Sequence, residues 1–440
     1  MKVIKDLFVI PSKDKYILYA PLKGNMMLVN GEVISLLQCF SKDVPVTSSE
    51  TLDQLIKAGI VVEEEPEVIF SWDEDATKST FLGVIPTTDC NLRCQYCYSS
   101  AGEHKDMMDW PIAKKGVDFI VGNALLKDKC DAAHIAFMGG GEPFYGASWD
   151  LVKKIVNYAL IEGENKKMPV RFGGTTNGVL NNTKIDWLIE HFHHLTLSFD
   201  GPADIQNKQR PLSNGGPSFD LVMNTIRKLD ESNFNYSVRC TISPEGLPRM
   251  GEIVEFFAEN THPDYCFIEP IFECGRCKTT NAVRPDLITF AKEYVKVKER
   301  ADSIKFPLRH IMDDISLLTN ISCGAGIGNF ILTPTGMVTA CPEIIKAEDP
   351  FAKIFIYGQY NPSTDKFDFS RERLDYLRSR KVEKIVPCGD CFAKFNCGGD
   401  CYIKATRQGS LFDNQSNVRC QMFRDLLKYK LEKELEVKNG

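Results

Sequence analysis

Short apolar runs separated by turn residues fill the first thirty positions of the chain. Their β-branched and aromatic content predicts three strands, over residues 7–11, 15–21 and 25–30. The pattern then changes to the helical period over residues 31–40 and 48–59, and the second of these segments starts with serines and ends with a glycine. We therefore expect a small domain in which strands are followed by helices.

From about residue 80 onward, apolar strand-like runs alternate with amphipathic segments. The amphipathic stretches 151–160 and 219–229 have the helical period. Repeated βα units of this kind predict a parallel sheet or barrel whose working site lies at the carboxyl ends of its strands. The expected strands are residues 81–87, 134–139, 170–176, 195–200, 236–242 and 266–272.

Composition and charge narrow the function classes. Hydrophobic residues make up 43% of the 440 residues, which is enough for two or three domains with substantial cores. The net charge of -6 disfavours a nucleic-acid binder, which needs a basic surface. The N-terminal apolar stretch ends at Pro11, and no later run approaches roughly eighteen apolar residues. We expect a cytoplasmic protein that binds neither nucleic acid nor membrane.

Sixteen cysteines are the most unusual feature of the composition. Disulfides do not normally persist in a reducing cytosol, so ligation of metal ions or iron–sulfur clusters explains these thiols better. Ten of the sixteen fall into two spaced groups, three between residues 90 and 97 and seven between residues 323 and 420. The grouping therefore predicts separate metal centres.

The first group, Cys90, Cys94 and Cys97, directly follows the first expected strand of the βα region. Three thiolates can hold three irons of a [4Fe–4S] cluster and leave the fourth iron open to a small molecule. A zinc site or a redox-active thiol pair is the alternative, but a structural zinc wants four ligands and His104 is the nearby candidate for the fourth. The spacing C-x3-C-x2-C, with Tyr96 before the last cysteine, resembles the radical S-adenosylmethionine (SAM) family.

Further motifs of that family lie at the ends of later strands. The resemblance implies that Glu142 of the GGEP motif meets the amino group of SAM and that Ser198 and Asp200 face its carboxylate and ribose. Glycines let the backbone approach a ligand closely, and a carboxylate suits an ammonium group. The implied cofactor-binding residues are Tyr96, Gly140, Gly141, Glu142, Pro143, Thr176, Asn177, Ser198, Asp200 and Arg210.

This family resemblance covers residues 81–272 and implies an α/β fold, a partial (β/α)6 TIM-like barrel over residues 78–300. In the family, a reduced cluster passes one electron to SAM, which splits into methionine and a 5'-deoxyadenosyl radical that takes a hydrogen atom from an unactivated carbon. A flavodoxin- or ferredoxin-type electron donor is an implied partner. An iron–sulfur electron-transfer protein is the non-enzyme alternative, although such a carrier has no use for a SAM pocket.

The late cysteines form a second series, C-x12-G-x4-C, then C-x2-C-x5-C-x3-C and a final cysteine. The series resembles the SPASM domain, which carries two auxiliary [4Fe–4S] clusters, and it implies such a domain over residues 310–440 and three clusters in all. One implied ligand set is Cys388, Cys391, Cys397 and Cys420. Three corners of the other cluster are implied to be Cys323, Cys341 and Cys401.

The fourth corner of that second auxiliary cluster has no obvious ligand. Some relatives have an extra cysteine a few residues before the series, whereas residues 313–322 contain none. Two interpretations stay open. Either Cys274 or Cys277 completes the cluster, or one iron stays open and can bind a substrate thiolate.

The N-terminal strands and helices resemble the winged-helix-like peptide-recognition domain of enzymes that modify ribosomally made peptides. The resemblance covers residues 1–68 and ends at the acidic run 63–67, a plausible linker. It implies a precursor peptide as partner, whose leader sequence adds a strand to an exposed sheet edge. A capping domain is the alternative, and a DNA-binding winged helix is disfavoured because these helices carry few basic residues.

Together the resemblances predict a maturase that abstracts a hydrogen atom from a precursor peptide and installs a crosslink. A cysteine thioether is the leading product, and a carbon–carbon or carbon–oxygen crosslink is the runner-up. Maturation of a sulfatase to formylglycine is a further alternative, but where relatives have an aspartate after the second cysteine of the series, this chain has Pro342. Glu343, the next residue, is the candidate base for the substrate.

Overall fold

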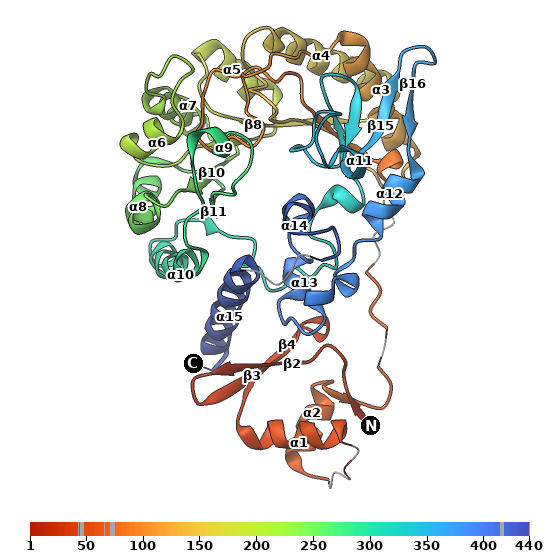
Figure 1. The fold of residues 1–440 in the computed structure, drawn as a ribbon, viewed down its shortest axis with the longest axis vertical. Helices are drawn as coiled ribbons and strands as arrows, with labels where there is room; N and C mark the ends of the chain where they lie inside the picture. The colour runs from red at the N-terminus through yellow and green to blue at the C-terminus, as the bar shows by residue number, and fades with distance from the viewer. Residues whose placement is uncertain (43, 45–47, 66, 71–74, 414–417, 440) are drawn as a thin grey trace. The chain divides into compact units, whose positions relative to one another are not determined.

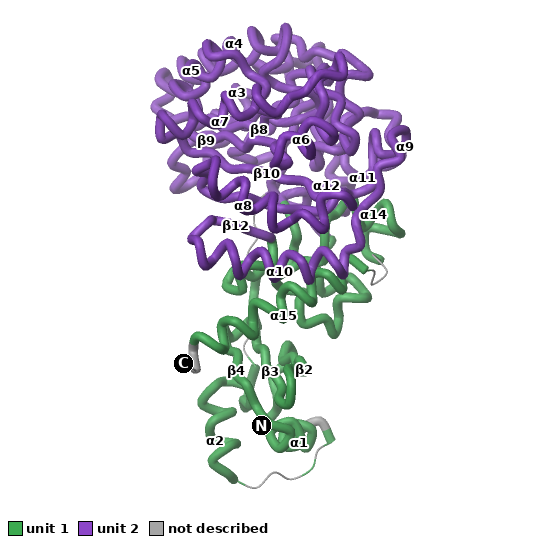
Figure 2. The backbone as a smooth tube through the Cα atoms, turned by 90° about the vertical axis from the view of Figure 1, so that its left-hand side faces the viewer, with its two compact units in different colours: residues 1–72, 311–323, 380–440 green, residues 73–310, 324–379 purple. Residues whose placement is uncertain are grey.

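The computed structural model describes residues 1–440 apart from 43, 45–47, 66, 71–74, 414–417 and 440. Figure 2 colours two compact units: unit 1 comprises residues 1–72, 311–323 and 380–440, and unit 2 comprises residues 73–310 and 324–379. The sequence predicted three domains with other boundaries, and that division stays a prediction. The expected linker 63–67 includes residue 66, which lies outside the described residues. Within the described part of the chain, no helix is long and apolar enough to cross a membrane.

Unit 1 begins with a three-stranded antiparallel sheet in the order β2-β3-β4 (Figure 1). Buried and exposed residues alternate along β2, as expected for a strand with one face on a core. A two-stranded antiparallel pair, β1 with β5, closes the segment. The elements are β1 (Lys2–Val3), β2 (Phe8–Ser12), β3 (Lys15–Ala20), β4 (Asn25–Val29), α1 (Gly31–Ser41), α2 (Glu50–Lys57) and β5 (Val61–Val62).

Both helices of this segment start at side-chain caps. The Asn30 side chain accepts a hydrogen bond from the backbone of α1, and Ser49 does the same for α2. The two helices pack Leu37 and Leu52 into one core with Leu18 of β3. The predicted order of strands followed by helices is therefore confirmed.

The cysteine-rich part of unit 1 contains α13 (Lys394–Cys397), α14 (Tyr402–Gln408) and α15 (Val418–Asn439). Specific bonds join it to the N-terminal sheet. The hydroxyl of Tyr19 donates to Oδ1 of Asn396 at 2.9 Å, and the hydroxyl of Ser12 donates to Glu432 of α15 at 2.7 Å. The two ends of the chain therefore share one unit.

Unit 2 is built on a sheet that has eleven strands over the described residues, in the order β12-β11-β10-β9-β8-β7-β6-β13-β14-β15-β16. Strands β6 to β11 each pair in parallel with the next, and they are the six strands expected from the sequence. Their bounds are β6 (Phe81–Val84), β7 (Ala133–Phe137), β8 (Val170–Thr176), β9 (His194–Ser198), β10 (Tyr236–Ile242), β11 (Tyr265–Pro270) and, at the edge, β12 (Leu308–Arg309).

Helices lie on the outer side of these parallel strands (Figure 1). In α7, the core-facing Val222, Ile226 and Leu229 recur at helical spacing and are fully buried. The α/β fold class expected from the sequence is confirmed. The helices are α3 (Trp110–Leu126), α4 (Ser148–Lys166), α5 (Asn182–His191), α6 (Ala203–Gln209), α7 (Phe219–Glu231), α8 (Met250–Asn260), α9 (Cys277–Thr280) and α10 (Leu287–Ser303).

The sheet continues beyond β6 with strands that the sequence pattern did not reveal. Strand β13 pairs in parallel with β6, and β14, β15 and β16 follow as an antiparallel meander. Phe119 of α3 stacks on Phe330 of β13 with ring centroids 4.8 Å apart, which fixes this extension to the helical layer. The extension comprises β13 (Phe330–Leu332), β14 (Met337–Thr339), α11 (Ala352–Phe355), β15 (Ile356–Asn361), β16 (Lys366–Phe369) and α12 (Arg371–Arg378).

Candidate active site

The first cysteine group lies on a loop that follows β6, here called the cysteine loop (residues 90–101). Cys90 Sγ accepts a hydrogen bond from the backbone of Leu92, and Cys97 Sγ accepts one from Ala101, each at 3.4 Å. Burial raises the pKa of the Cys90 thiol, and the nearby Cys94 and Cys97 raise it further. Burial likewise raises the pKa of Cys94, to about 11. Electrostatic interactions therefore link the three predicted thiols, and burial shields Cys90 and Cys94 from water.

The GGEP turn after β7 lies directly against the segment that leads into this loop. A Cβ atom on Gly141 would stand 2.1 Å from the carbonyl oxygen of Asp89, and the backbone N–H of Glu142 donates to the same oxygen at 2.8 Å. The hydroxyl of Ser99 donates to the Gly140 carbonyl at 2.8 Å. Glycine is required at position 141 because two backbone segments touch there. Pro143 follows in the same turn.

Glu142 is buried, with its carboxylate turned toward the end of β8. Oε1 accepts from the Thr176 hydroxyl at 2.8 Å, and Oε2 accepts from the backbone N–H of Asn177 at 2.7 Å. Burial raises the pKa of Glu142 to about 7, although these hydrogen bonds oppose the shift. The carboxylate is therefore poised between its charged and neutral forms near neutral pH. Its contact with the SAM amino group stays a prediction.

Asn177 connects the end of β8 to the cysteine loop. Its side-chain amide donates to Oδ1 of Asn91 at 2.7 Å and approaches Cys90 Sγ at 3.7 Å. The predicted residues Thr176 and Asn177 thus meet both Glu142 and the first cysteine of the loop. Asn91 lies between the cysteines in the sequence, and nothing in its residue type marked this role.

Asp200, which follows β9, is fully buried and accepts hydrogen bonds from several elements. Its partners include the hydroxyl of Tyr96, the side-chain amide of Gln209 at 2.7 Å and the backbone of Thr241 at 3.0 Å. Nε of Arg210 donates to the same carboxylate at 3.0 Å. These bonds hold Tyr96 and Arg210 in place beside the cysteine loop.

Arg210 is buried as well, and its guanidinium lies over the Tyr96 ring at 5.1 Å from the centroid. Its Nη1 reaches within 3.9 Å of Cys94 Sγ. Ser198 lies half-buried at the end of β9. The structure thus gathers the predicted cofactor residues around the carboxyl ends of β7 to β9, while their individual contacts with SAM stay predictions.

Tyr98 connects the cysteine loop with the sheet extension of the same unit. Its hydroxyl donates to the Gly139 carbonyl at 2.7 Å. Burial raises the pKa of Tyr98, and electrostatic interaction with Cys97, Glu343 and Cys341 raises it further. Cys341 and Glu343, in the turn after β14, therefore come within electrostatic range of the phenol, and their roles as auxiliary ligand and substrate base stay predictions.

Cys274 and Cys277 lie in a turn after β11 that packs on the cysteine loop, and both are buried. The backbone N–H of Arg276, between them, donates to the carbonyl of Cys97 at 2.9 Å. Thr280 Oγ1 donates to the carbonyl of Gln95 at 2.7 Å. The sequence singled out the two cysteines of this turn. The hydrogen bonds described between the turn and the cysteine loop, however, come from Arg276 and Thr280.

The four cysteines of one predicted auxiliary ligand set all belong to unit 1, and the set stays a prediction. Burial raises the pKa of Cys388 to about 12, with further increases from Cys391 and Cys420. Burial also raises the pKa of Cys397, and Asp400, Cys420 and Cys388 raise it further. These electrostatic interactions link Cys388 with each of the other three thiols. A set of four neighbouring thiols is the donor set that an iron–sulfur cluster uses.

A buried ion pair fixes the geometry of this set. Nε of Arg419, at the start of α15, donates to both carboxylate oxygens of Asp400 at 2.9 and 3.0 Å. The backbone N–H of Asp400 in turn donates to Cys397 Sγ at 3.1 Å. The pair therefore holds Cys420, the residue after Arg419, next to the turn that carries Cys397.

The second auxiliary set is divided between the two units. Cys323 and Cys401 belong to unit 1. Burial is the largest cause of the raised pKa of Tyr402, and Cys323 raises that pKa further. Cys341 belongs to unit 2. This ligand set stays a prediction, as does the role of Cys274 or Cys277 in completing it.

The donor chemistry of the cysteine loop fits an iron–sulfur cluster better than a single ion. Among the described residues, no three His, Cys, Asp or Glu side chains are arranged to hold one metal ion. A cubane cluster separates its thiolates more widely than one ion does, and three thiols with no carboxylate or imidazole are a soft donor set. The assignment of this site to a cluster and not to zinc therefore rests on donor chemistry and stays a prediction.

Residues 84–257 match a family model described as the radical SAM superfamily. An uncharacterised protein of Methanocaldococcus jannaschii is 30% identical over 183 residues, which cover 41% of this chain and 59% of that protein, so the match spans less than two thirds of that relative. A cysteine-type anaerobic sulfatase-maturating enzyme of Clostridium perfringens is 22% identical over 374 residues, which cover 80% of this chain and 96% of the enzyme.

Two kinds of solved structure share the fold. Native anSMEcpe with bound AdoMet aligns with a TM-score of 0.63 at 17% identity, over 82% of this chain and 99% of that chain. SuiB of Streptococcus suis bound to its precursor peptide SuiA aligns with a TM-score of 0.56 at 16% identity, over 96% of this chain and 99% of that chain. At these identities the likeness concerns the fold.

Proposed function

From the match of residues 84–257 to the radical SAM superfamily model, we propose that the protein is a radical SAM enzyme that modifies a ribosomally made precursor peptide. It binds SAM and a [4Fe–4S] cluster on Cys90, Cys94 and Cys97. Two auxiliary clusters, a leader sequence on the peptide and a flavodoxin- or ferredoxin-type electron donor complete the proposal. The product is a crosslink, with a cysteine thioether as the leading form.

The observation that carries the proposal is the position of Tyr98. The phenol donates to the Gly139 carbonyl at 2.7 Å and interacts electrostatically with Cys97 of the cysteine loop, Cys341 of the late cysteine series and Glu343. The predicted hydrogen-abstracting site is therefore within electrostatic range of a predicted auxiliary ligand and of a candidate base. This neighbourhood suits a reaction that must remove a hydrogen atom, a proton and an electron from one substrate.

The peptide substrate is supported by the N-terminal segment and by the extent of the fold likeness. The sheet β2-β3-β4 and helices α1 and α2 form a distinct layer of unit 1 with its own core. The likeness to SuiB bound to its precursor peptide spans 96% of this chain, against 82% for anSMEcpe. A protein that handles a leader-containing peptide therefore accounts for more of this chain than one that modifies a sulfatase.

When bound, the cluster and SAM supply one-electron cleavage of the sulfonium and a carbon radical that abstracts a hydrogen atom. The chain's own residues prepare the site for that chemistry. Glu142, held by Thr176 and Asn177, offers a carboxylate to an ammonium group. Asp200 fixes Tyr96 and Arg210 beside Cys94. Glu343 is the candidate that takes a proton from the substrate.

Thioether formation breaks one C–H and one S–H bond and makes one C–S bond, so the peptide loses two hydrogens in all. We would incubate the reconstituted protein anaerobically with SAM, a reductant and a cysteine-containing peptide encoded beside the gene, then use mass spectrometry with thiol alkylation. Loss of two hydrogens together with one alkylatable thiol supports the thioether. The same mass loss with every thiol retained refutes it and indicates a carbon–carbon or carbon–oxygen crosslink.

Sulfatase maturation is the second candidate, favoured by the alignment that covers 96% of the Clostridium perfringens enzyme. In that reaction a cysteine side chain becomes an aldehyde, so the peptide loses sulfur and gains oxygen. A sulfatase-derived cysteine peptide in the same assay separates the two candidates. Conversion of that peptide, with no change in the peptide encoded beside the gene, would replace the crosslinking proposal.

A further inference from the structure

The turn after β11 approaches the cysteine loop more closely than a side chain would allow. Gly275 adopts a positive φ of 53°, and a Cβ atom there would stand 2.2 Å from the carbonyl oxygen of Cys97 and 2.3 Å from that of Tyr98. The next residue, Arg276, donates its backbone N–H to the same Cys97 carbonyl at 2.9 Å. This close approach places the Arg276 side chain under the loop that carries the cluster ligands.

The Arg276 guanidinium binds the loop along its length. Nη1 donates to the carbonyl of Cys94 at 3.0 Å, and Nη2 donates to the carbonyl of Ala101 at 2.5 Å. Nε donates to Oε1 of Glu103 at 3.1 Å. A planar fork that bonds both ends of a loop restricts the positions of the ligands between them, here Cys94 and Cys97.

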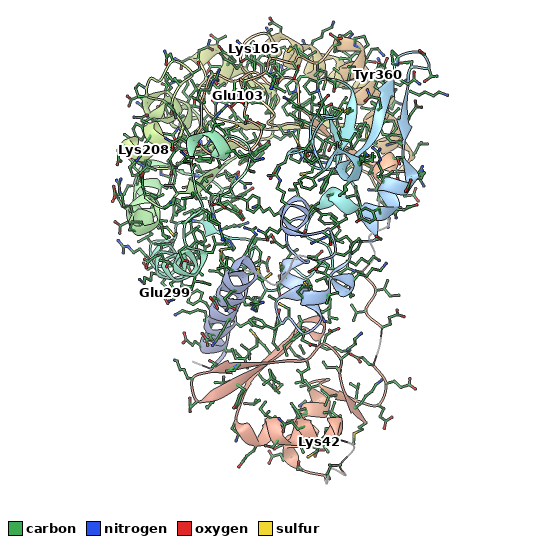
Figure 3. The ribbon with its side chains drawn as sticks, in the orientation of Figure 1. Lys42, Glu103, Lys105, Lys208, Glu299 and Tyr360 are labelled. Atoms are coloured by element: carbon green, nitrogen blue, oxygen red, sulfur yellow. The ribbon has the colours of Figure 1, made fainter. Side chains whose placement is uncertain are left out.

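The charge of Arg276 is neutralised less completely than that of the other arginine at the site. Arg210 pairs with Asp200, which is fully buried, so its charge has a strong partner nearby. The Arg276 side chain is 7% exposed, and its carboxylate partner Glu103 is 49% exposed, so water screens Glu103 in part and it offsets the arginine charge only partly. Glu103 and the neighbouring Lys105 are labelled in Figure 3. The buried Arg276 charge therefore adds positive potential at the loop, which favours an added electron on a cluster held there.

We propose that Arg276 is a positioning residue that fixes the cysteine loop and, through its buried charge, raises the reduction potential of the cluster held by Cys90, Cys94 and Cys97. The proposal rests on the radical SAM part of the proposed function and is independent of the peptide substrate. It also predicts that Glu103 acts in the opposite direction, because its carboxylate offsets the arginine.

The test is a redox titration of the reconstituted protein, followed by electron paramagnetic resonance and accompanied by an iron assay. The Arg276→Gln variant should keep its iron. Its ratio of reduced to oxidised cluster at a fixed potential should fall about tenfold, which corresponds to a reduction potential lower by about 59 mV for a one-electron couple. Glu103→Gln should raise that ratio. Lys105→Gln removes one charge from the same segment at an exposed side chain and should leave the ratio unchanged.

An Arg276→Gln variant with full iron and the wild-type potential would overturn the proposal. If that variant fails to bind the cluster, the reduction potentials of the Arg276→Lys and Glu103→Gln variants test the proposal instead. Arg276→Lys keeps the charge and should keep the potential, and a Glu103→Gln protein at the wild-type potential would also refute the proposal. Because no peptide is present in the titration, failure of the peptide reaction leaves this result unaffected.

Discussion

Nε of Arg210 lies 3.0 Å from Oδ2 of Asp200, and the two side chains are 8% and 0% exposed. The same carboxylate binds the hydroxyl of Tyr96, the residue before Cys97. A buried ion pair is therefore part of the scaffold of the cysteine loop. Its disruption should affect both the fold and the cluster.

Asp200→Asn should destabilise the protein by about 3–5 kcal/mol, because it leaves the buried Arg210 charge without a partner. Anaerobic denaturant unfolding of the reconstituted protein measures the change. Asp204→Asn is the matched control, since Asp204 pairs with Arg249 at the surface and should cost less than about 1 kcal/mol. Equal small losses in both variants would show that the buried pair does not stabilise the site.

Stability should depend on pH through Glu142. Burial raises its pKa from 4.5 to about 7, so between these values the folded state binds more protons than the unfolded state. Stability from this group is therefore full below about pH 4.5, is lost as the pH rises through about 7, and is level above that. Between pH 5 and 8 the wild type should lose up to about 3 kcal/mol relative to Glu142→Gln. Unfolding free energies of the two proteins across this range measure the difference.

The exposed Glu164 of α4 provides the control for this pH dependence. Glu164→Gln should follow the wild-type curve in parallel. A Glu142→Gln curve that is also parallel to the wild type would mean that Glu142 is ionised throughout the range.

Cys388→Ala should remove about four irons from the reconstituted protein. The loss should leave 5'-deoxyadenosine formation from SAM in place, because Cys388 belongs to unit 1 and is not a residue of the cysteine loop, which belongs to unit 2. Iron assay and chromatography of the nucleoside products measure the two effects. Cys130→Ala is the control, since that thiol donates to the Ala132 carbonyl and should be dispensable for iron. Undiminished iron in Cys388→Ala would exclude the predicted set.

Gly141→Ala should weaken the site strongly. Its Cβ would meet the Asp89 carbonyl at 2.1 Å, so the GGEP turn or the segment before Cys90 must shift. We expect a loss of stability of at least about 1–3 kcal/mol and weaker SAM binding, measured by unfolding and by equilibrium dialysis.

Gly122→Ala is the matched control for that substitution. Gly122 lies in α3 with open space around the position of a Cβ atom, and alanine favours a helix by about 0.5–1 kcal/mol. A Gly141→Ala protein that tolerates the change as well as Gly122→Ala would show that the contact can relax.

Features whose residues are close in the chain could be predicted from the sequence. The cysteine loop and the GGEP turn are short motifs in which spacing itself brings the functional groups together. The six parallel strands were visible because buried strands carry continuous apolar runs. The N-terminal layer was visible for a similar reason, since its strands and helices have different periods.

Contacts made across the sheet could not be predicted in this way. Glu343 and Cys341 come within electrostatic range of Tyr98 because β13 pairs with β6, and short strands of three residues leave little periodicity to read. Arg276 reaches Cys94 because β11 ends at the same edge as β6. The sequence also assigned Asp200 to the cofactor, and its bonds to Tyr96 and Arg210 add a role that depends on the folded geometry.

The pairing of β6 with β13 also bears on how the chain is made. These neighbours in the sheet are separated by residues 85–329, so a ribosome needs roughly 12 to 50 s to deliver β13 after β6 has emerged. During that interval the nascent chain carries an open strand edge, which is a template for pairing with other unfinished chains. Protein yield should therefore depend on chaperone supply and on translation speed, and a chain that stops before residue 330 should aggregate.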